Sequence, residues 1–163
     1  MQPLFVFVEG SDDERFFKKY FSTQQVKFIQ YAHMKNKEIC QYLRAIKGNS
    51  RYVFIADSDR KLPGEKAKKI CEIYKECDIK NVYIVNLEIE SWYMAGLSSH
   101  CSSKFKIKCL SDTNSFCKEQ FNCLVPRKYS RIDFMLEVLR DFDFQEAKMR
   151  NNSFRFFSDN VPR

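Results

Sequence analysis

Four short apolar runs alternate, through the first half of the chain, with stretches whose apolar residues recur at helical spacing. The runs cover 5–8, 26–32, 52–56 and 82–87 and are rich in β-branched and aromatic side chains. Several lack alternating polarity, which is typical of strands buried on both faces. We therefore predict an α/β fold with a mainly parallel sheet of at least four strands, helices on both faces and right-handed crossovers.

The predicted helices follow the same alternation. Ser11 and Glu14 have the spacing of a capping box for the first helix. Beyond Gly96 the pattern weakens, so we expect a core at 1–97 and a helical C-terminal extension at 98–163, packed together as one compact domain. The helices are predicted at 11–21, 36–47, 63–78, 88–96 and 130–140, with a short last helix capped by Asn152 and Ser153.

The amino-acid composition indicates the size of the domain and argues against a membrane protein and a zinc-binding protein. A chain of 163 residues with 44% hydrophobic residues, including 16 Phe and 8 Tyr, is the size of one domain with a substantial core. No apolar run approaches the roughly 20 residues of a bilayer span, and the N-terminus lacks a signal-peptide pattern. Seven cysteines, an odd count without a Cys-x-x-Cys pair, favour reduced packing residues over zinc ligands. We expect a cytoplasmic protein without a membrane segment.

The formal net charge of +7 is unevenly distributed along the chain. Between Ser98 and Arg131 there are seven Lys or Arg residues against Asp112 and Glu119, a balance of +5. A basic stretch of this kind suits a polyanion such as DNA or RNA, although a solvated basic face gives the same pattern. The candidate phosphate-contacting residues are Lys104, Lys106, Lys108, Arg127, Lys128 and Arg131.

Three of the four predicted strands end in carboxylates. Glu9 follows the first, Asp57 and Asp59 the third, and Glu88 and Glu90 the fourth. Parallel strands end at one edge of a sheet, so these groups are expected to converge where α/β folds hold ligands. Asp57 and Asp59, two apart at an extended strand end, can point to the same side. The alternative is a set of separate turn and cap acids that favour the helix dipoles.

Asp13 adds a further carboxylate, one helical turn beyond Glu9. Crowded carboxylates repel one another unless a cation lies among them, and hard oxygen ligands favour Mg²⁺ or Mn²⁺. We therefore expect Glu9, Asp13, Asp57 and Asp59 to be metal ligands. Glu88 or Glu90 is expected to bind a second ion or to orient the attacking water.

Three short motifs carry a family resemblance. Val8-Glu9-Gly10-Ser11-Asp12-Asp13, Ile55-Ala56-Asp57-Ser58-Asp59 and Leu87-Glu88-Ile89-Glu90-Ser91-Trp92 together resemble the TOPRIM domain of topoisomerases, primases and nucleases. The likeness covers residues 4 to about 97 and is nearest to small stand-alone TOPRIM-like proteins and the overcoming-lysogenisation-defect nucleases.

The resemblance implies a Rossmann-like TOPRIM fold and metal-dependent cleavage of phosphodiesters, with Glu9 and the Asp57/Asp59 pair holding one or two Mg²⁺ ions. In the nuclease branch the acid four residues after the glutamate, here Asp13, joins them. Related proteins often act in defence or mobile-element systems beside an ATPase partner, so a partner of that kind is expected here.

Other families fit the motifs less well. A haloacid-dehalogenase phosphatase needs its Asp-x-Asp on the first strand, a receiver domain needs an acid pair there, and no Gly-x-x-x-x-Gly-Lys loop occurs. The remaining rival is a TOPRIM-like module that binds nucleic acid or a partner protein without cutting.

Trp92 and Tyr93 directly follow Glu90 and Ser91, so two roles are open for them. They could stack on nucleic-acid bases, or they could fix the helix that follows the acids. We favour packing, because aromatic residues next to a strand end bury most of their surface.

Overall fold

A computed structural model describes residues 3–48 and 50–163 of the chain. Its four strands are β1 (Leu4–Val8), β2 (Val26–Gln30), β3 (Arg51–Asp57) and β4 (Val82–Val85). They form one parallel sheet in the order β2-β1-β3-β4. Leu4 of β1 lies opposite Val26 on one side and Arg51 on the other, which fixes the register of the central strand. The predicted α/β fold with a parallel sheet is thereby confirmed.

The chain divides into two compact units. The first runs up to Ile84 and includes Arg163, and the second is Val85–Pro162. The division thus lies at the end of β4 and not at the expected boundary after residue 97.

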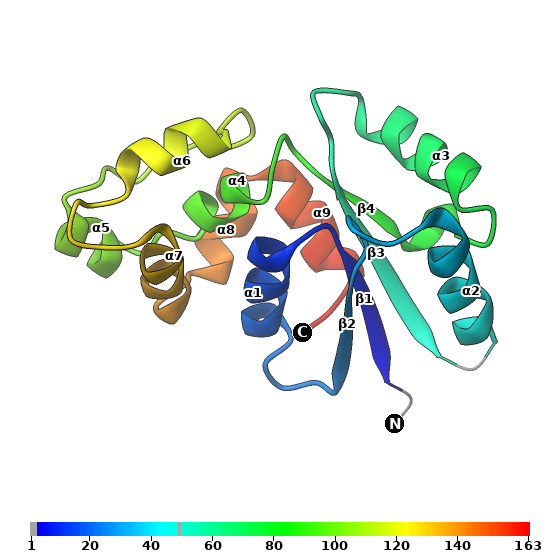
Figure 1. Ribbon diagram of the computed structural model, residues 1–163. Coiled ribbons are helices and arrows are strands. Elements are labelled where there is room, and N and C mark those ends of the chain that lie inside the picture. The colour runs from blue at the N-terminus through cyan, green and yellow to red at the C-terminus, as the bar shows by residue number, and fades with distance from the viewer. Residues whose placement is uncertain (1–2, 49) are drawn as a thin grey trace. The chain divides into compact units, whose positions relative to one another are not determined.

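Helices cover both faces of the sheet in the first unit (Figure 1). The helix α1 (Ser11–Tyr20) lies on one face, while α2 (Asn36–Ile46) and α3 (Pro63–Ile73) lie on the other. A short 3₁₀ helix, η1 (Ile79–Asn81), leads into β4. This arrangement follows from strand alternation, because neighbouring residues of β1 point to opposite faces and both faces are apolar.

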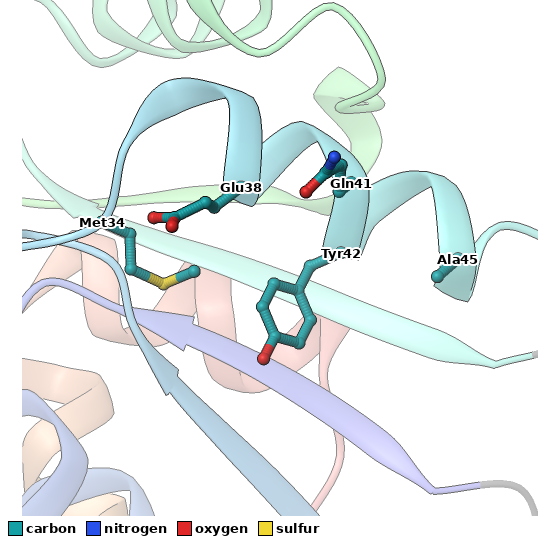
Figure 2. Close-up of a pocket in the computed structure, with 5 residues that line it drawn as sticks. All are labelled: Met34, Glu38, Gln41, Tyr42 and Ala45. Carbon is teal, nitrogen blue, oxygen red and sulfur yellow. The ribbon is translucent and has the colours of Figure 1, made fainter.

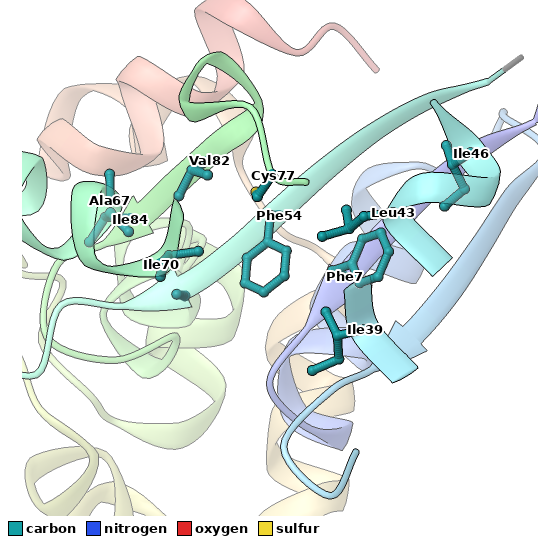
Figure 3. Packing of buried hydrophobic residues seen from close by; sticks show 11 residues of the cluster. Phe7, Ile39, Leu43, Ile46, Phe54, Ala67, Ile70, Cys77, Val82 and Ile84 are labelled. Carbon is teal, nitrogen blue, oxygen red and sulfur yellow. The ribbon is translucent and has the colours of Figure 1, made fainter. Parts of the chain in front are cut away.

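The core beneath α2 and α3 is built from the strands that carry the candidate acids (Figure 3). Phe7 of β1 stacks on Phe54 of β3 with ring centroids 5.4 Å apart. Ile39 and Leu43 of α2 and Ile70 of α3 pack against the same cluster. The close packing of β1 against β3 fixes the relative position of the two strand ends.

The second unit is helical. Its central helix α4 (Glu90–Ala95) is buried along its whole length. The other helices are α5 (Ser99–Phe105), α6 (Lys118–Leu124), α7 (Arg131–Arg140), α8 (Phe144–Arg150) and α9 (Asn152–Asn160).

Several sequence predictions about helices need correction. The N-cap residue of α1 is Gly10, whose amide donates a 3.0 Å hydrogen bond to Asp13 Oδ2, so the predicted capping box of Ser11 and Glu14 is wrong. Helix α3 ends at Ile73, before the predicted end at Asp78. The helices α5, α6 and α8 are short, and no clear apolar period marks them in the sequence.

The C-terminal helices also differ from the prediction. The cap of α9 is Asn151, whose side chain accepts a hydrogen bond from the amide of Phe154 at 3.0 Å. Among the apolar residues predicted to line one face of α7, Met135 and Leu139 are buried, but Ile132 and Leu136 are 50% and 49% exposed. Phe134 and Val138 take the buried positions, because aromatic contacts with α6 set the rotation of the helix.

The cysteines and the helix lengths bear on two further expectations. Each of the seven cysteines lies in the described part of the chain and is free. In residues 3–48 and 50–163, none of the helices has the length and apolar character that crossing a bilayer requires.

Candidate functional site

The strand ends of the first unit bring two of the predicted acids to neighbouring positions. Glu9 directly follows β1, Asp57 is the last residue of β3, and these two parallel strands are paired. Glu9 is exposed, whereas Asp57 is half-buried. The point between β1 and β3 is where the strand order reverses, because β2 lies on the other side of β1. Open α/β sheets hold ligands at such a point, outside the carboxyl ends of the strands.

Tyr31, which follows β2, has a hydroxyl group whose pKa is affected by the acids near these strand ends. Its hydroxyl donates a hydrogen bond of 2.8 Å to the carbonyl oxygen of Ile55 in β3. Burial raises the pKa of Tyr31 well above its ordinary value, and the negative charges of Glu9, Asp13 and Asp57 raise it further. All three carboxylates therefore lie within electrostatic range of one hydroxyl group, and Tyr31 remains a neutral donor near pH 7.

Asp13 also stabilises the first turn of α1. It is buried in the first turn of α1, and its Oδ2 accepts a hydrogen bond of 3.0 Å from the amide of Gly10. An acid at this position also interacts favourably with the positive end of the helix dipole. Asp13 thus holds the start of α1 directly behind Glu9.

Asp59 lies in a tight turn and not on an extended strand end. β3 stops at Asp57, and the amide of Lys61 donates a 2.9 Å hydrogen bond to the carbonyl oxygen of Ser58. The φ angles of Asp59 and Arg60 are 49° and 62°, in the left-handed region that residues other than glycine rarely adopt. The prediction that Asp57 and Asp59 point the same way rested on an extended end, which is absent at Asp59.

The carboxylate of Asp59 forms an ion pair with Lys66 of α3. The side chain of Asp59 is 61% exposed, but that of Lys66 is only 18% exposed. The ammonium group is therefore held beside the strand ends, where it partly neutralises this acid.

A pocket of about 250 Å³ lies next to these groups and is lined by residues of the first unit alone. Glu9 and Asp59 belong to its lining, together with aromatic, aliphatic and basic side chains. The other lining residues are Tyr31, Phe54, Ala56, Lys61, Lys66, Lys69, Ile70, Ile73 and Tyr74.

The four acids of the first unit can be compared with the ligands that a divalent ion requires. Glu9, Asp13, Asp57 and Asp59 all supply hard carboxylate oxygens, the ligand type that Mg²⁺ prefers. In the part of the chain that the structure describes, however, no three Asp, Glu, His or Cys side chains are grouped closely enough to hold a metal ion. The chemistry of the donors fits Mg²⁺, and holding it would require Asp59 to separate from Lys66.

Glu88 and Glu90 belong to the second unit, where each has partners of its own. Glu88 Oε2 accepts a hydrogen bond of 2.8 Å from the amide of Lys118, at the start of α6. Glu90 is only 3% exposed and forms an ion pair with Arg131. Burial raises the pKa of Glu90, while the charge of Arg131 opposes that shift.

The predicted basic residues fall into two groups. Lys104, Lys106, Lys108, Arg127 and Lys128 are exposed. Lys104 forms an ion pair with Glu137 of α7. Arg131 is half-buried, with its guanidinium over the ring of Phe121 at 5.7 Å and its Nε donating to Asn122 at 2.8 Å. Arg131 thus connects α4, α6 and α7. The five exposed residues are the ones that a phosphate group could reach from solvent.

A second, larger pocket of about 430 Å³ lies on α2 (Figure 2). Met34, Glu38, Gln41, Tyr42 and Ala45 line it, and none of them is a predicted site residue. Glu38, its one carboxylate, already accepts a 2.9 Å hydrogen bond from the amide of Lys35. Since predicted acids line the smaller pocket, the smaller pocket is the candidate site.

Comparison with known proteins adds no relative. No family model matches the chain, and no curated protein or solved structure matches it either.

Sequence reasoning missed the basic and aromatic residues of the candidate site. Lys61, Lys66 and Lys69 look like solvated charges of a surface turn and helix, and Tyr31 looks like the end of a strand. One feature of the sequence could have indicated the lysines. Pro63 starts a helix soon after Asp59, and a helix that begins so near the end of β3 has its first turns close to that strand end.

Proposed function

We propose that this protein is a nuclease that cleaves phosphodiester bonds of DNA or RNA with Mg²⁺ or Mn²⁺. The observation that carries the proposal is the position of Glu9 and Asp57 at the ends of two paired strands, with Asp13 of α1 near enough that all three charges raise the pKa of Tyr31. The order and placement of the TOPRIM-like motifs support the same interpretation.

Asp57 and Asp59 would hold the principal ion, and Glu9 and Asp13 would be ligands to it or to a second ion. Once bound, the ion would polarise a phosphoryl oxygen and lower the pKa of bound water. The Tyr31 hydroxyl is a neutral donor that orients the end of β2 over β3. Glu88 and Glu90 are engaged by Lys118 and Arg131, so the proposal assigns the metal to the acids of the first unit.

The test is incubation of the protein with plasmid, single-stranded DNA and RNA, in Mg²⁺, Mn²⁺ or EDTA. The variants Glu9→Gln and Asp57→Asn should each reduce the rate at least about 100-fold, the scale of losing one group that stabilises developing charge. Glu72→Gln, an exposed change on α3, is the matched control and should cut at the parent rate. Cutting that persists in EDTA, or in the double variant Glu9→Gln/Asp57→Asn, would contradict the proposal.

A second candidate is a module that binds nucleic acid or a partner protein without cutting it. Two observations favour it: the described residues contain no ready group of three metal-binding side chains, and Asp59 is paired with Lys66. This candidate predicts oligonucleotide binding that is the same in EDTA and Mg²⁺ and survives the substitutions at Glu9 and Asp57, with no cleavage in either ion.

A further inference from the structure

The pocket beside Glu9 is small, and its lining combines aromatic and aliphatic side chains with basic ones. Its volume of about 250 Å³ is below the 300–1,000 Å³ typical of sites for drug-sized ligands. A ligand that fills it is therefore small, or is one unit of a longer molecule.

Part of the lining is an aromatic and aliphatic wall. The rings of Tyr31, Phe54 and Tyr74 form a continuous row, with centroid separations of 4.6 Å and 5.4 Å. Ile70 and Ile73 of α3 extend this wall, and Ile73 is 43% exposed. Phe54 and Ile70 are buried and support this surface from behind, so Tyr31, Tyr74 and Ile73 are the side chains that a ligand can contact. A flat apolar group such as a nucleobase suits them, because any base offers a π-face to an aromatic ring.

The lining also includes three lysines, Lys61, Lys66 and Lys69. Two of them come from α3, and the third comes from the turn that ends with Lys61. That turn holds Asp59 and Arg60 at positive φ, a strained backbone that persists where the surrounding structure imposes it. Lysines are point charges well suited to phosphate oxygens. They outnumber Glu9 and Asp59, the carboxylates of the same lining.

We propose that this pocket binds one nucleoside monophosphate unit, with the base against Tyr31, Tyr74 and Ile73 and the phosphate on Lys66 and Lys69. The inference rests on the proposed function, because it names the part of the substrate that lies beside the acids. When the phosphate engages Lys66, Asp59 loses its ion-pair partner and becomes available to a cation. The same chemistry is offered by a free nucleotide and by the phosphorylated end of a strand.

The experiment is an NMR titration of the whole chain in EDTA, so that neither metal nor cleavage contributes. The probes are adenosine, AMP, inorganic phosphate, a trinucleotide with a 5′-phosphate and the same trinucleotide without it. AMP and the phosphorylated trinucleotide should shift the signals of Tyr31 and Tyr74. Adenosine and inorganic phosphate should each bind at least about tenfold more weakly, because each makes only one of the two kinds of contact.

The variant Lys66→Gln/Lys69→Gln should weaken AMP binding at least about tenfold, because it removes charge-assisted hydrogen bonds to the phosphate. Lys68→Gln is the matched control: it removes the same kind of charge from an exposed position of α3 outside the pocket lining, and should leave AMP binding unchanged. Tyr74→Leu should weaken AMP and leave inorganic phosphate unaffected. A melting curve of each variant excludes unfolding as the cause of any weaker binding.

The outcomes separate this inference from the nuclease proposal. AMP binding that depends on Lys66 and Lys69, without any cleavage in Mg²⁺ or Mn²⁺, supports the pocket and contradicts the nuclease. Cleavage that the double lysine variant leaves unchanged supports the nuclease and contradicts the pocket. Tighter binding of the phosphorylated trinucleotide than of AMP identifies a strand end as the source of the ligand, and equal binding identifies a free nucleotide. Absence of binding by both at about 10 mM overturns the inference.

Discussion

The indole Nε1 of Trp92 donates a hydrogen bond of 2.8 Å to the hydroxyl oxygen of Ser153. Phe154 and Phe157 of α9 contact the same indole, with ring centroids 5.2 Å and 5.3 Å away. Ser153 in turn donates to Asn151 Oδ1 at 2.8 Å. The acidic segment after β4 and the C-terminal Asn-Ser-Phe segment are therefore joined in one buried cluster of the second unit.

This arrangement predicts that Trp92→Ala destabilises the protein by about 3–5 kcal/mol, since it empties a fully buried aromatic site. Urea unfolding followed by circular dichroism measures the effect. Ser153→Ala should cost about 1–3 kcal/mol, because the indole N–H is then buried without an acceptor. A Trp92→Ala protein with the parent midpoint and weakened oligonucleotide affinity would instead place the indole in a substrate groove.

The two glycines Gly96 and Gly64 should respond to alanine in opposite ways. A Cβ on Gly96 would lie 2.2 Å from the ring of Phe142, whereas nothing lies within 4 Å of one on Gly64. Gly96→Ala should therefore cost about 1–3 kcal/mol by overpacking. Gly64→Ala, within α3, should stabilise by about 0.4–1 kcal/mol. Equal melting temperatures for the two variants would contradict the close packing of Gly96 against Phe142.

The burial of Glu90 predicts a pH dependence of stability. Burial raises the pKa of Glu90, so folding favours its protonated form. Its contribution is fully present below the unfolded pKa and is lost as pH rises through the raised folded pKa. Relative to Glu90→Gln, the parent should therefore gain stability as the pH falls from about 7 to about 4.

Glu14 supplies a control of opposite sign. Hydrogen bonds from Lys18 and Gln30 lower the pKa of Glu14, so its contribution is present above the unfolded pKa and lost as the pH falls through the folded one. Relative to Glu14→Gln, the parent should lose stability over the same acid range. Urea midpoints measured at several pH values test both variants, and parallel curves for the parent and Glu90→Gln would contradict the first prediction.

The exposed basic residues predict a salt-sensitive interaction with nucleic acid. Because each lysine bound to a phosphate releases counterions, reversing Lys106 and Lys108 to Glu should weaken oligonucleotide binding. The log–log salt slope should fall by about 1 for each phosphate that is no longer neutralised. Fluorescence anisotropy at several salt concentrations gives both quantities. Lys37→Glu/Lys47→Glu reverses two exposed charges of the first unit and is the matched control. Unchanged affinity and slope in the Lys106/Lys108 variant would make these lysines solubility residues.

The amino-acid sequence by itself determined the strands and helices of the first unit. Buried parallel strands such as Phe5–Val8 and Tyr52–Ala56 are apolar on both faces, and α2 has a regular apolar stripe, so the local pattern and the final environment agree. The sequence also predicted that Glu9 and Asp57 lie at the same edge of the sheet, because parallel strands end at one edge. The packing of Trp92 followed from its apolar neighbours, Met94 and Ala95.

Only the tertiary structure decided the partners of the acids. Asp13 caps α1, Asp59 pairs with Lys66, and Glu90 pairs with Arg131, 41 residues away in the sequence. The sequence pattern around a charged residue does not indicate its ion-pair partner, because the pairing depends on the positions of α3 and α7 in the folded chain. The face that α7 buries was decided in the same way, since both of its apolar stripes fit a helix and contact with α6 selected the one with Phe134.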